Sequence, residues 1–98
     1  MAGPLPAKVS RAAREIGEDF AGWRKILGLT AEQVAERADI SRVTLRKLEQ
    51  GDPTVGFHVV LRVARALGIL DTITDALDPL RTDLGRARAA LLERRRVR

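Results

Sequence analysis

The segment between residues 30 and 51 carries helix-start and helix-stop signals so closely spaced that only two short helices and a tight turn fit between them. Thr30 opens a Thr-x-x-Gln pattern, in which its hydroxyl and the Gln33 side chain cap the first turn of a helix reciprocally. Ser41 is a second cap residue, and Gly51 ends the helix that Ser41 begins. We therefore predict two helices joined by a turn, over residues 31–38 and 42–50.

The turn between these helices is also specified by its residues. Asp39 and Ile40 leave room only for a tight turn, in which Asp39 needs a positive φ, a conformation that Asp tolerates better than most residues. Ala35 is small enough to let the two helices approach closely. The apolar contacts between them are expected from Val34, Ala38, Ile40, Leu45 and Leu48. The segment is thus predicted to be a helix-turn-helix.

Apolar residues recur at helical spacing along the rest of the chain, and no alternating stretch is long enough to predict a sheet. The further expected helices cover residues 11–27 (capped by Ser10), 57–67, 72–77 (capped by Asp71) and 83–95. The apolar face expected for the first of them comprises Ile16, Phe20, Trp23 and Leu27, and that of the fourth helix comprises Val60, Leu61, Ala64 and Leu67. Gly17 and Gly22 lower the helix propensity of the first helix. We predict an all-α fold in which the first five of these helices form one compact domain and the helix at 83–95 follows it.

The net charge of +5 is confined to one end of the chain. Residues 1–80 hold eleven basic and eleven acidic side chains, whereas residues 81–98 hold seven Arg against two acidic residues. A basic end contacts a polyanion or an acidic partner protein, or it is a solvated tail. Its narrow apolar stripe allows this extension to be helical. We divide the chain into a flexible arm, a helix-turn-helix domain and a basic segment, over residues 1–9, 10–80 and 81–98.

Several classes of function are excluded by what the chain lacks. It has no Cys and a single His, so no disulfide, thiol nucleophile or zinc-thiolate site can form. No motif joins His58 to an acid or a nucleophile, so it is expected at the surface or against a phosphate. No apolar run approaches the ~18 residues that span a bilayer, and residues 1–7 lack a signal pattern. We expect a cytoplasmic protein that is not an enzyme and uses no metal, cofactor or membrane.

The outer face of the helix at 42–50 is basic and has the residue types that read DNA. Arg42 and Val43 lie in its first turn, where Arg can pair bidentately with guanine and Val can touch a thymine methyl group. The cap hydroxyl of Ser41 and the helix N-terminus suit a phosphate. The alternative is an ordinary helical hairpin whose basic face is only solvated. The candidate DNA-binding residues are Ser41, Arg42, Val43, Thr44, Arg46, Lys47, Gln50 and Thr54.

The stretches at residues 23–30 and 48–51, with the helices between them, resemble the Xre-type (Cro/repressor-like) helix-turn-helix family over roughly residues 16–70. The resemblance implies a compact five-helix lambda-repressor-like DNA-binding domain that works as a homodimer. It also implies that Arg24 and Glu49 form a structural pair between the first and third helices. This chain departs from the family pattern at Ala31, Asp39 and Val43, where Gln, Gly and a polar base reader are common. These departures concern individual base and phosphate contacts.

Residues 51–55 and 61–68, with the Arg-Val-Arg ending, are similar to HipB-like antitoxins, which repress their own operon and neutralise a HipA-like kinase toxin. Two functions follow. The first is a sequence-specific repressor of transcription that reads a palindromic operator in double-stranded DNA with the helix at 42–50. The alternative is an antitoxin that neutralises a kinase-like toxin protein and autoregulates its operon.

Overall fold

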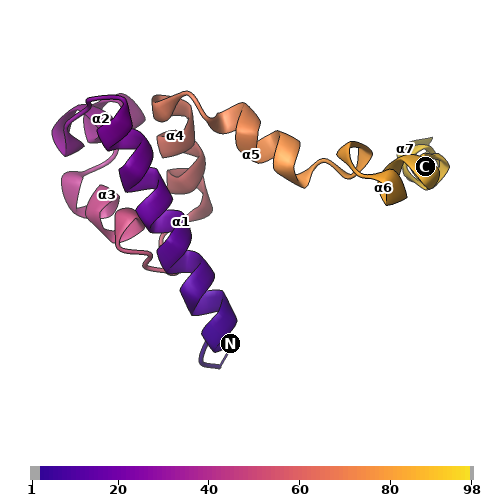
Figure 1. The fold of residues 1–98 in the computed structure, drawn as a ribbon, viewed down its shortest axis with the longest axis horizontal. Helices are drawn as coiled ribbons and strands as arrows, with labels where there is room; N and C mark the ends of the chain where they lie inside the picture. The colour runs from indigo at the N-terminus through magenta and orange to yellow at the C-terminus, as the bar shows by residue number, and fades with distance from the viewer. Residues whose placement is uncertain (1–2, 98) are drawn as a thin grey trace.

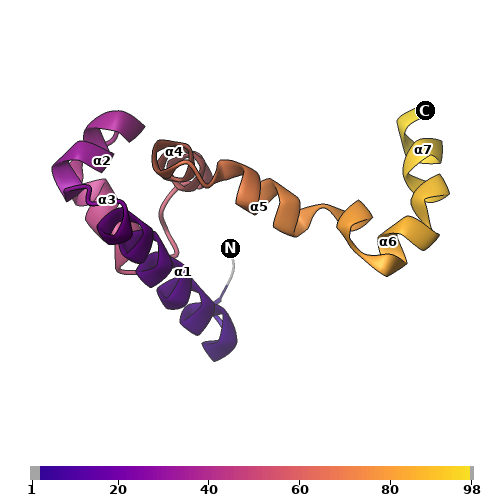
Figure 2. The same ribbon diagram turned by 45° about the horizontal axis from the view of Figure 1, so that its top comes forward.

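The computed structural model describes residues 3–97, and the side chains of residues 3–93. Within this part of the chain the protein is all-helical, as predicted, and no strand is present. Figures 1 and 2 show the helices of the N-terminal part gathered in one bundle and those of the C-terminal part extending away from it. The elements are α1 (Ala7–Ile26), α2 (Ala31–Ala38), α3 (Arg42–Glu49), α4 (Phe57–Leu67), α5 (Leu70–Leu77), the 3-10 turn η1 (Pro79–Arg81), α6 (Asp83–Ala87) and α7 (Ala89–Val97).

The hydrophobic core lies between α1, α2, α3 and α4. Its most completely buried large side chains, Val34, Leu45 and Val63, come from three different helices, so the core joins them into one unit. The first residue of α5 and the residue before it pack against the edge of this core. The buried side chains are Phe20, Val34, Ala35, Ala38, Leu45, Leu48, Val59, Val63, Ala64 and Leu67.

The helix bundle brings the backbones of α1 and α3 into direct contact. A Cβ atom on Gly17 would lie 2.5 Å from the carbonyl oxygen of Leu48 and 2.7 Å from the backbone nitrogen of Gly51. Gly51 itself has a φ of +78°, a conformation that favours glycine. Gly17, which the sequence marks only as a weak helix former, is therefore the residue that lets the end of α3 sit against α1.

The predicted helix boundaries differ from the structure at three places. α1 begins at Ala7, because the Pro6 carbonyl accepts from the backbone N–H groups of Val9 and Ser10 and starts the helix before the expected cap. α5 begins at Leu70, whose contact with the core extends the helix ahead of Asp71. The single helix expected over residues 83–95 is two helices, broken at Arg88 with φ −116° and ψ 23°.

The predicted apolar faces of α1 and α4 are only partly buried. Of the predicted α1 face only Phe20 is buried, while Trp23 is 43% exposed and Ile16 is 53% exposed. On α4 Ala64 and Leu67 are buried as predicted, but Val59 and Val63 are buried in place of Val60 and Leu61. The reason is that α4 turns its stripe toward α1, α2 and α3, and no element covers the outer part of the α1 face.

Residues 78–97 form what we call the C-terminal arm, which comprises η1, α6 and α7. The arm begins at the end of α5, which itself projects from the bundle, and points away from α1 (Figures 1 and 2). The Cα radius of gyration is 16.3 Å, whereas a compact chain of this length has about 13 Å. Across residues 3–97 no helix is both long and apolar enough to cross a membrane.

Candidate nucleic-acid interface

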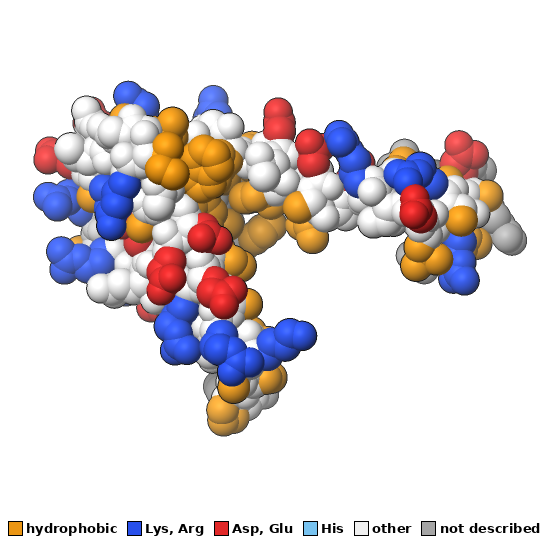
Figure 3. Space-filling model, in the orientation of Figure 1, with side chains coloured by type: hydrophobic (Ala, Val, Ile, Leu, Met, Phe, Trp, Pro, Cys, Tyr) orange, Lys and Arg blue, Asp and Glu red, His pale blue; other side chains and the backbone are white. Residues whose placement is uncertain are grey.

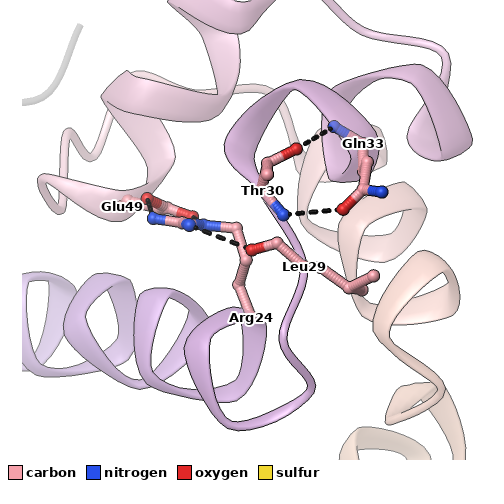
Figure 4. Close-up of polar contacts among 5 residues, drawn as sticks. All are labelled: Arg24, Leu29, Thr30, Gln33 and Glu49. Atoms are coloured by element: carbon pink, nitrogen blue, oxygen red, sulfur yellow. Dashed lines mark hydrogen bonds and ion pairs between the residues drawn. The ribbon is translucent and has the colours of Figure 1, made fainter.

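The predicted helix-turn-helix is formed by α2, the turn at Asp39 and α3. Thr30 and Gln33 make the complete capping box, with the Gln33 N–H donating to the Thr30 hydroxyl over 3.0 Å and the Thr30 N–H to the Gln33 side chain over 2.9 Å (Figure 4). Asp39 has the predicted positive φ, +57°. The capping box and the left-handed turn both lie within residues 30–39, so the start of α2 and its turn into α3 are determined by nearby residues.

The N-terminus of α3 is closed by Ser41 and Thr44. The Ser41 Oγ accepts from the Thr44 backbone N–H over 3.0 Å and donates to the Thr44 Oγ1 over 2.8 Å. The Ser41 hydroxyl, predicted to contact a phosphate, is thus engaged with both the backbone and the side chain of Thr44.

The remaining candidate residues of α3 lie on one outer face. Arg42, Arg46 and Lys47 are exposed, and Val43 is 64% exposed, although it is apolar. Gln50, the residue that caps the end of α3, is also exposed. Leu45 and Leu48 face the core instead, so the basic residues of α3 lie on the side away from its buried leucines.

Part of this outer face surrounds a hollow of about 400 Å³. Arg42, Val43 and Arg46 line its sides, and Ala31 contributes from the start of α2. Lys47 and Gln50 are not among the lining residues. Arg24 lines the hollow as well, so three guanidinium groups and a methyl-bearing side chain are gathered around one concave surface. Guanidinium and methyl groups are the chemistry that contacts base edges.

An ion pair between Arg24 and Glu49 lies against this hollow. The Arg24 Nε donates to the Glu49 Oε2 over 2.8 Å and its Nη2 donates to Oε1 over 3.1 Å, which makes the pair bidentate (Figure 4). The Arg24 and Glu49 side chains are 16% and 15% exposed. Their hydrogen bond, supported by the Glu49 charge and opposed by burial, raises the pKa of Arg24 above its ordinary value.

Arg24 also reaches the loop before α2. Its Nη1 donates to the backbone carbonyl oxygen of Leu29 over 3.3 Å. One side chain of α1 thus holds both the end of α3 and the entrance to α2. The family resemblance implied the pair with Glu49. A contact with a backbone carbonyl leaves no mark on residue types, so the sequence could not have indicated the contact with Leu29.

Thr54 lies outside α3 and is held in a turn by Asp52. Its backbone N–H and its hydroxyl donate to the same Asp52 carboxylate oxygen, over 2.8 Å and 2.6 Å. These two hydrogen bonds, that from the hydroxyl first, lower the pKa of Asp52. Thr54 would have to release this carboxylate before it could donate to a phosphate.

The other candidate residues of the sequence are placed without a chemical site around them. His58 is exposed, and its Nδ1 accepts from the Arg62 Nε over 3.1 Å. No group of three or more potential metal-binding side chains occurs among residues 3–93. Of the basic C-terminal residues, Arg98 and the side chains of residues 94–97 lie outside the described part of the structure.

Comparison with known proteins agrees with this geometry. The chain matches the helix-turn-helix domain family over residues 9–77. It is 47% identical over 45 residues to an uncharacterized HTH-type transcriptional regulator of Methanothermobacter thermautotrophicus. That match covers 46% of this chain and 65% of the relative, so it spans a little under two thirds of the relative's length. No solved structure matches the chain.

Proposed function

Since this chain belongs to the helix-turn-helix domain family, we propose that it is a sequence-specific repressor of transcription that reads double-stranded DNA with α3. The observation that carries the proposal is the outer face of α3, where Arg42, Val43 and Arg46 surround one hollow. The alternative is a basic hairpin whose outer face is only solvated. That alternative does not explain why the apolar Val43 is exposed beside Arg42 and Arg46.

In this proposal the residues of α3 divide into base readers and phosphate contacts. Arg42 and Arg46 point from a rigid helix and can pair bidentately with the O6 and N7 atoms of guanine, while Val43 contacts a thymine methyl group. Lys47, Gln50 and the Thr44 hydroxyl donate to phosphate oxygens beside the groove. Phosphate contacts position the protein and base contacts select the sequence.

The proposed target is a palindrome that is bound by a homodimer. A helix of the length of α3 reads only a few base pairs, so one domain binds weakly and with little specificity. Two copies related by a two-fold axis place their α3 helices in successive major grooves, ~34–36 Å apart. Such a dimer represses transcription simply by occupying its operator.

The second candidate function is that of an antitoxin. Its support is the C-terminal arm, which carries exposed apolar residues such as Leu84 and Leu91 away from the DNA-reading face. In that function the arm would bind a kinase-like toxin and α3 would autoregulate the operon. A neighbouring gene for a kinase-like protein, and co-purification of its product with this chain, distinguish the antitoxin from a repressor that works alone.

The experiment that tests the proposal is a selection of binding sites from a random DNA library with the full chain. We expect the selected sites to share two inverted half-sites whose centres are ~10–10.5 base pairs apart, or a multiple of that distance. A salt series then compares the affinity for a selected site with that for random DNA. Phosphate contacts weaken equally on both DNAs as the salt concentration rises, so a remaining difference in affinity comes from base contacts. Selected sites without any common sequence would contradict the proposal.

A further inference from the structure

An apolar groove lies between α1, α4 and α5, on the part of the bundle that no helix covers. Its volume is about 330 Å³. Figure 3 shows hydrophobic surface in the angle between α1 and α5, with acidic side chains on α1 beside it. The groove is lined by Ile16, Asp19, Phe20, Trp23, Val60, Ile69, Thr72 and Ile73. It explains why the predicted apolar face of α1 is exposed.

The chain exposes much more surface than a compact protein of its size. Its accessible area is 7759 Å², whereas a folded monomer of 10.8 kDa exposes about 5,500 Å². The excess is therefore about 2,200 Å². A standard stable interface buries ~800 Å² on each partner. The unburied surface of one chain is thus more than enough for an extensive contact with another.

The C-terminal arm supplies a second part of this surface. Leu84 is 64% exposed and Leu91 is 52% exposed, and both line a smaller hollow of about 260 Å³ between α6 and α7. Arg88, which lines the same hollow, brings a positive charge beside these leucines. The arm thus presents apolar side chains beside a positive charge, and the groove presents an apolar lining beside the negative charge of Asp19. The two surfaces are therefore complementary in charge.

The start of the arm is held by local hydrogen bonds, and the arm extends away from the bundle (Figures 1 and 2). The Asp78 carboxylate accepts from the Leu80 N–H over 2.9 Å, and the Thr82 hydroxyl donates to the Pro79 carbonyl over 2.6 Å. The Thr82 oxygen also accepts from the Gly85 N–H over 2.9 Å. A Cβ atom on Gly85 would collide with the Pro79 carbonyl oxygen, so glycine allows α6 to pack on η1.

We propose that the groove between α1, α4 and α5 receives the C-terminal arm of a second copy of this chain, and that the exchange is reciprocal. Leu84 and Leu91 of one copy enter the groove of the other, where Arg88 meets Asp19. The locked turn at residues 78–85 is the reason that the occupant is another copy and not the arm of the same chain. The inference rests on the proposed function only in that the dimer would carry the two α3 helices.

The first experiment measures the dimer dissociation constant of the full chain by sedimentation. Leu84→Asp changes a residue that is exposed in the single chain, so the bundle stays folded. We expect it to raise the dissociation constant by about 30-fold or more, as for a central interface residue. Ile26→Asp is the matched control, because Ile26 is 77% exposed and does not line the groove. Equal effects of both variants, or a monomeric parent chain, would overturn the proposal.

A second experiment identifies which arm fills which groove. The chain has no Cys, so single cysteines can be placed freely. Thr72→Cys in the groove and Leu84→Cys in the arm are mixed as separate proteins and oxidised, and we expect a disulfide between the two. Glu36→Cys, exposed on α2, replaces the groove cysteine as the control. A disulfide that forms only within one chain carrying both cysteines would show that the arm folds back, against the proposal.

DNA binding separates this inference from the proposed function. If the interface is as proposed, monomeric Leu84→Asp still binds a single half-site as the parent does and loses affinity only for the full palindrome. A parent chain that reads its half-site but never dimerises through the groove would overturn the inference and leave the reading by α3 intact. A groove-dependent dimer that binds no selected DNA would sustain the inference and contradict the proposed function.

Discussion

Gly17 and Gly51 meet backbone against backbone where α1 crosses the end of α3. The position of a Gly17 Cβ would be 2.7 Å from the Gly51 nitrogen, and that of a Gly51 Cβ would be 2.5 Å from the Cα of Arg14. Neither glycine can gain a side chain without a shift of one helix relative to the other. The orientation of α3, and therefore of its outer face, depends on this contact.

Gly17→Ala should destabilise the protein although alanine is the better helix former. The added methyl group meets backbone atoms that cannot rotate away, and overpacking of this kind costs ~1–3 kcal/mol. Thermal unfolding should show a midpoint lower by roughly 4–8 °C for each kcal/mol. Gly22→Ala is the matched control on the same helix, since nothing lies within 4 Å of its added Cβ. That variant should gain up to ~1 kcal/mol from helix propensity, and a loss of similar size in both would contradict the role of the α1–α3 contact.

Glu49→Ala should cost about 1–3 kcal/mol of folding free energy. The Arg24–Glu49 pair is bidentate and largely shielded, so its loss falls between that of an exposed pair, under ~1 kcal/mol, and that of a buried one, ~3–5 kcal/mol. Arg81→Ala is the comparison, because it removes a 3.2 Å pair with Asp75 whose side chains are 64% and 53% exposed. If the midpoint of thermal unfolding falls by the same amount in the two variants, water already screens the ion pair between Arg24 and Glu49.

Removal of the Thr54 hydroxyl should raise the pKa of Asp52. That hydroxyl is the main cause of the lowered pKa, and the Thr54 backbone N–H is the second cause. Thr54→Val keeps the backbone N–H, so the pKa of Asp52 should rise only part of the way toward its ordinary value near 4. Because the pKa is lower in the folded state, the interaction stabilises the protein above the ordinary pKa and is lost as the pH falls through the folded value. NMR titration of the Asp52 carboxylate measures this directly. An unchanged pKa in Thr54→Val would show that the hydroxyl does not bind the carboxylate in solution.

Arg46→Ala should weaken binding to a selected DNA site by ~1–3 kcal/mol, or roughly 5- to 150-fold, and relax specificity at particular base pairs. Lys47→Ala, one residue along the same face, should weaken selected and random DNA alike and reduce the salt dependence by about 0.9 per lost phosphate contact. Arg11→Ala is the control, as an exposed Arg on the opposite end of α1 from Arg24. Fluorescence anisotropy with labelled duplexes measures all three, and a loss on random DNA as large as that on selected DNA for Arg46→Ala would exclude α3 as the base reader.

The features that the sequence predicts are those that depend on residues close together in the chain. The capping box of Thr30, the cap at Ser41 and the left-handed turn at Asp39 are all local, and each is present as expected. The contact of Gly17 was not predictable, because it depends on how two distant helices meet. The same limit applies to α1. Its apolar face can be predicted from helical spacing, but the sequence does not show that other helices leave part of that face uncovered.

The break at Arg88 has a similar cause. Periodicity favoured one helix over residues 83–95, since Leu84, Ala87 and Leu91 share a stripe. In the structure the N–H of Arg88 bonds the carbonyl oxygens of both Leu84 and Gly85, and the helix ends there. The packing of α6 on η1 determines where that helix stops, and this packing is set by Gly85 and Pro79.

Trp23 gives this protein its own optical reporter. It is the only Trp in a chain without Tyr, so the intrinsic emission comes from a single indole at the rim of the groove. Trp23 is 43% exposed, so water reaches its ring and its emission is red-shifted relative to that of a buried indole. Any molecule that covers the groove removes water from it and shifts the emission to the blue, whereas a single DNA half-site on the outer face of α3 leaves it unchanged. Unlabelled protein can therefore be titrated with a DNA half-site or a candidate partner, or concentrated to promote self-association. The emission wavelength of Trp23 then shows whether the groove became covered.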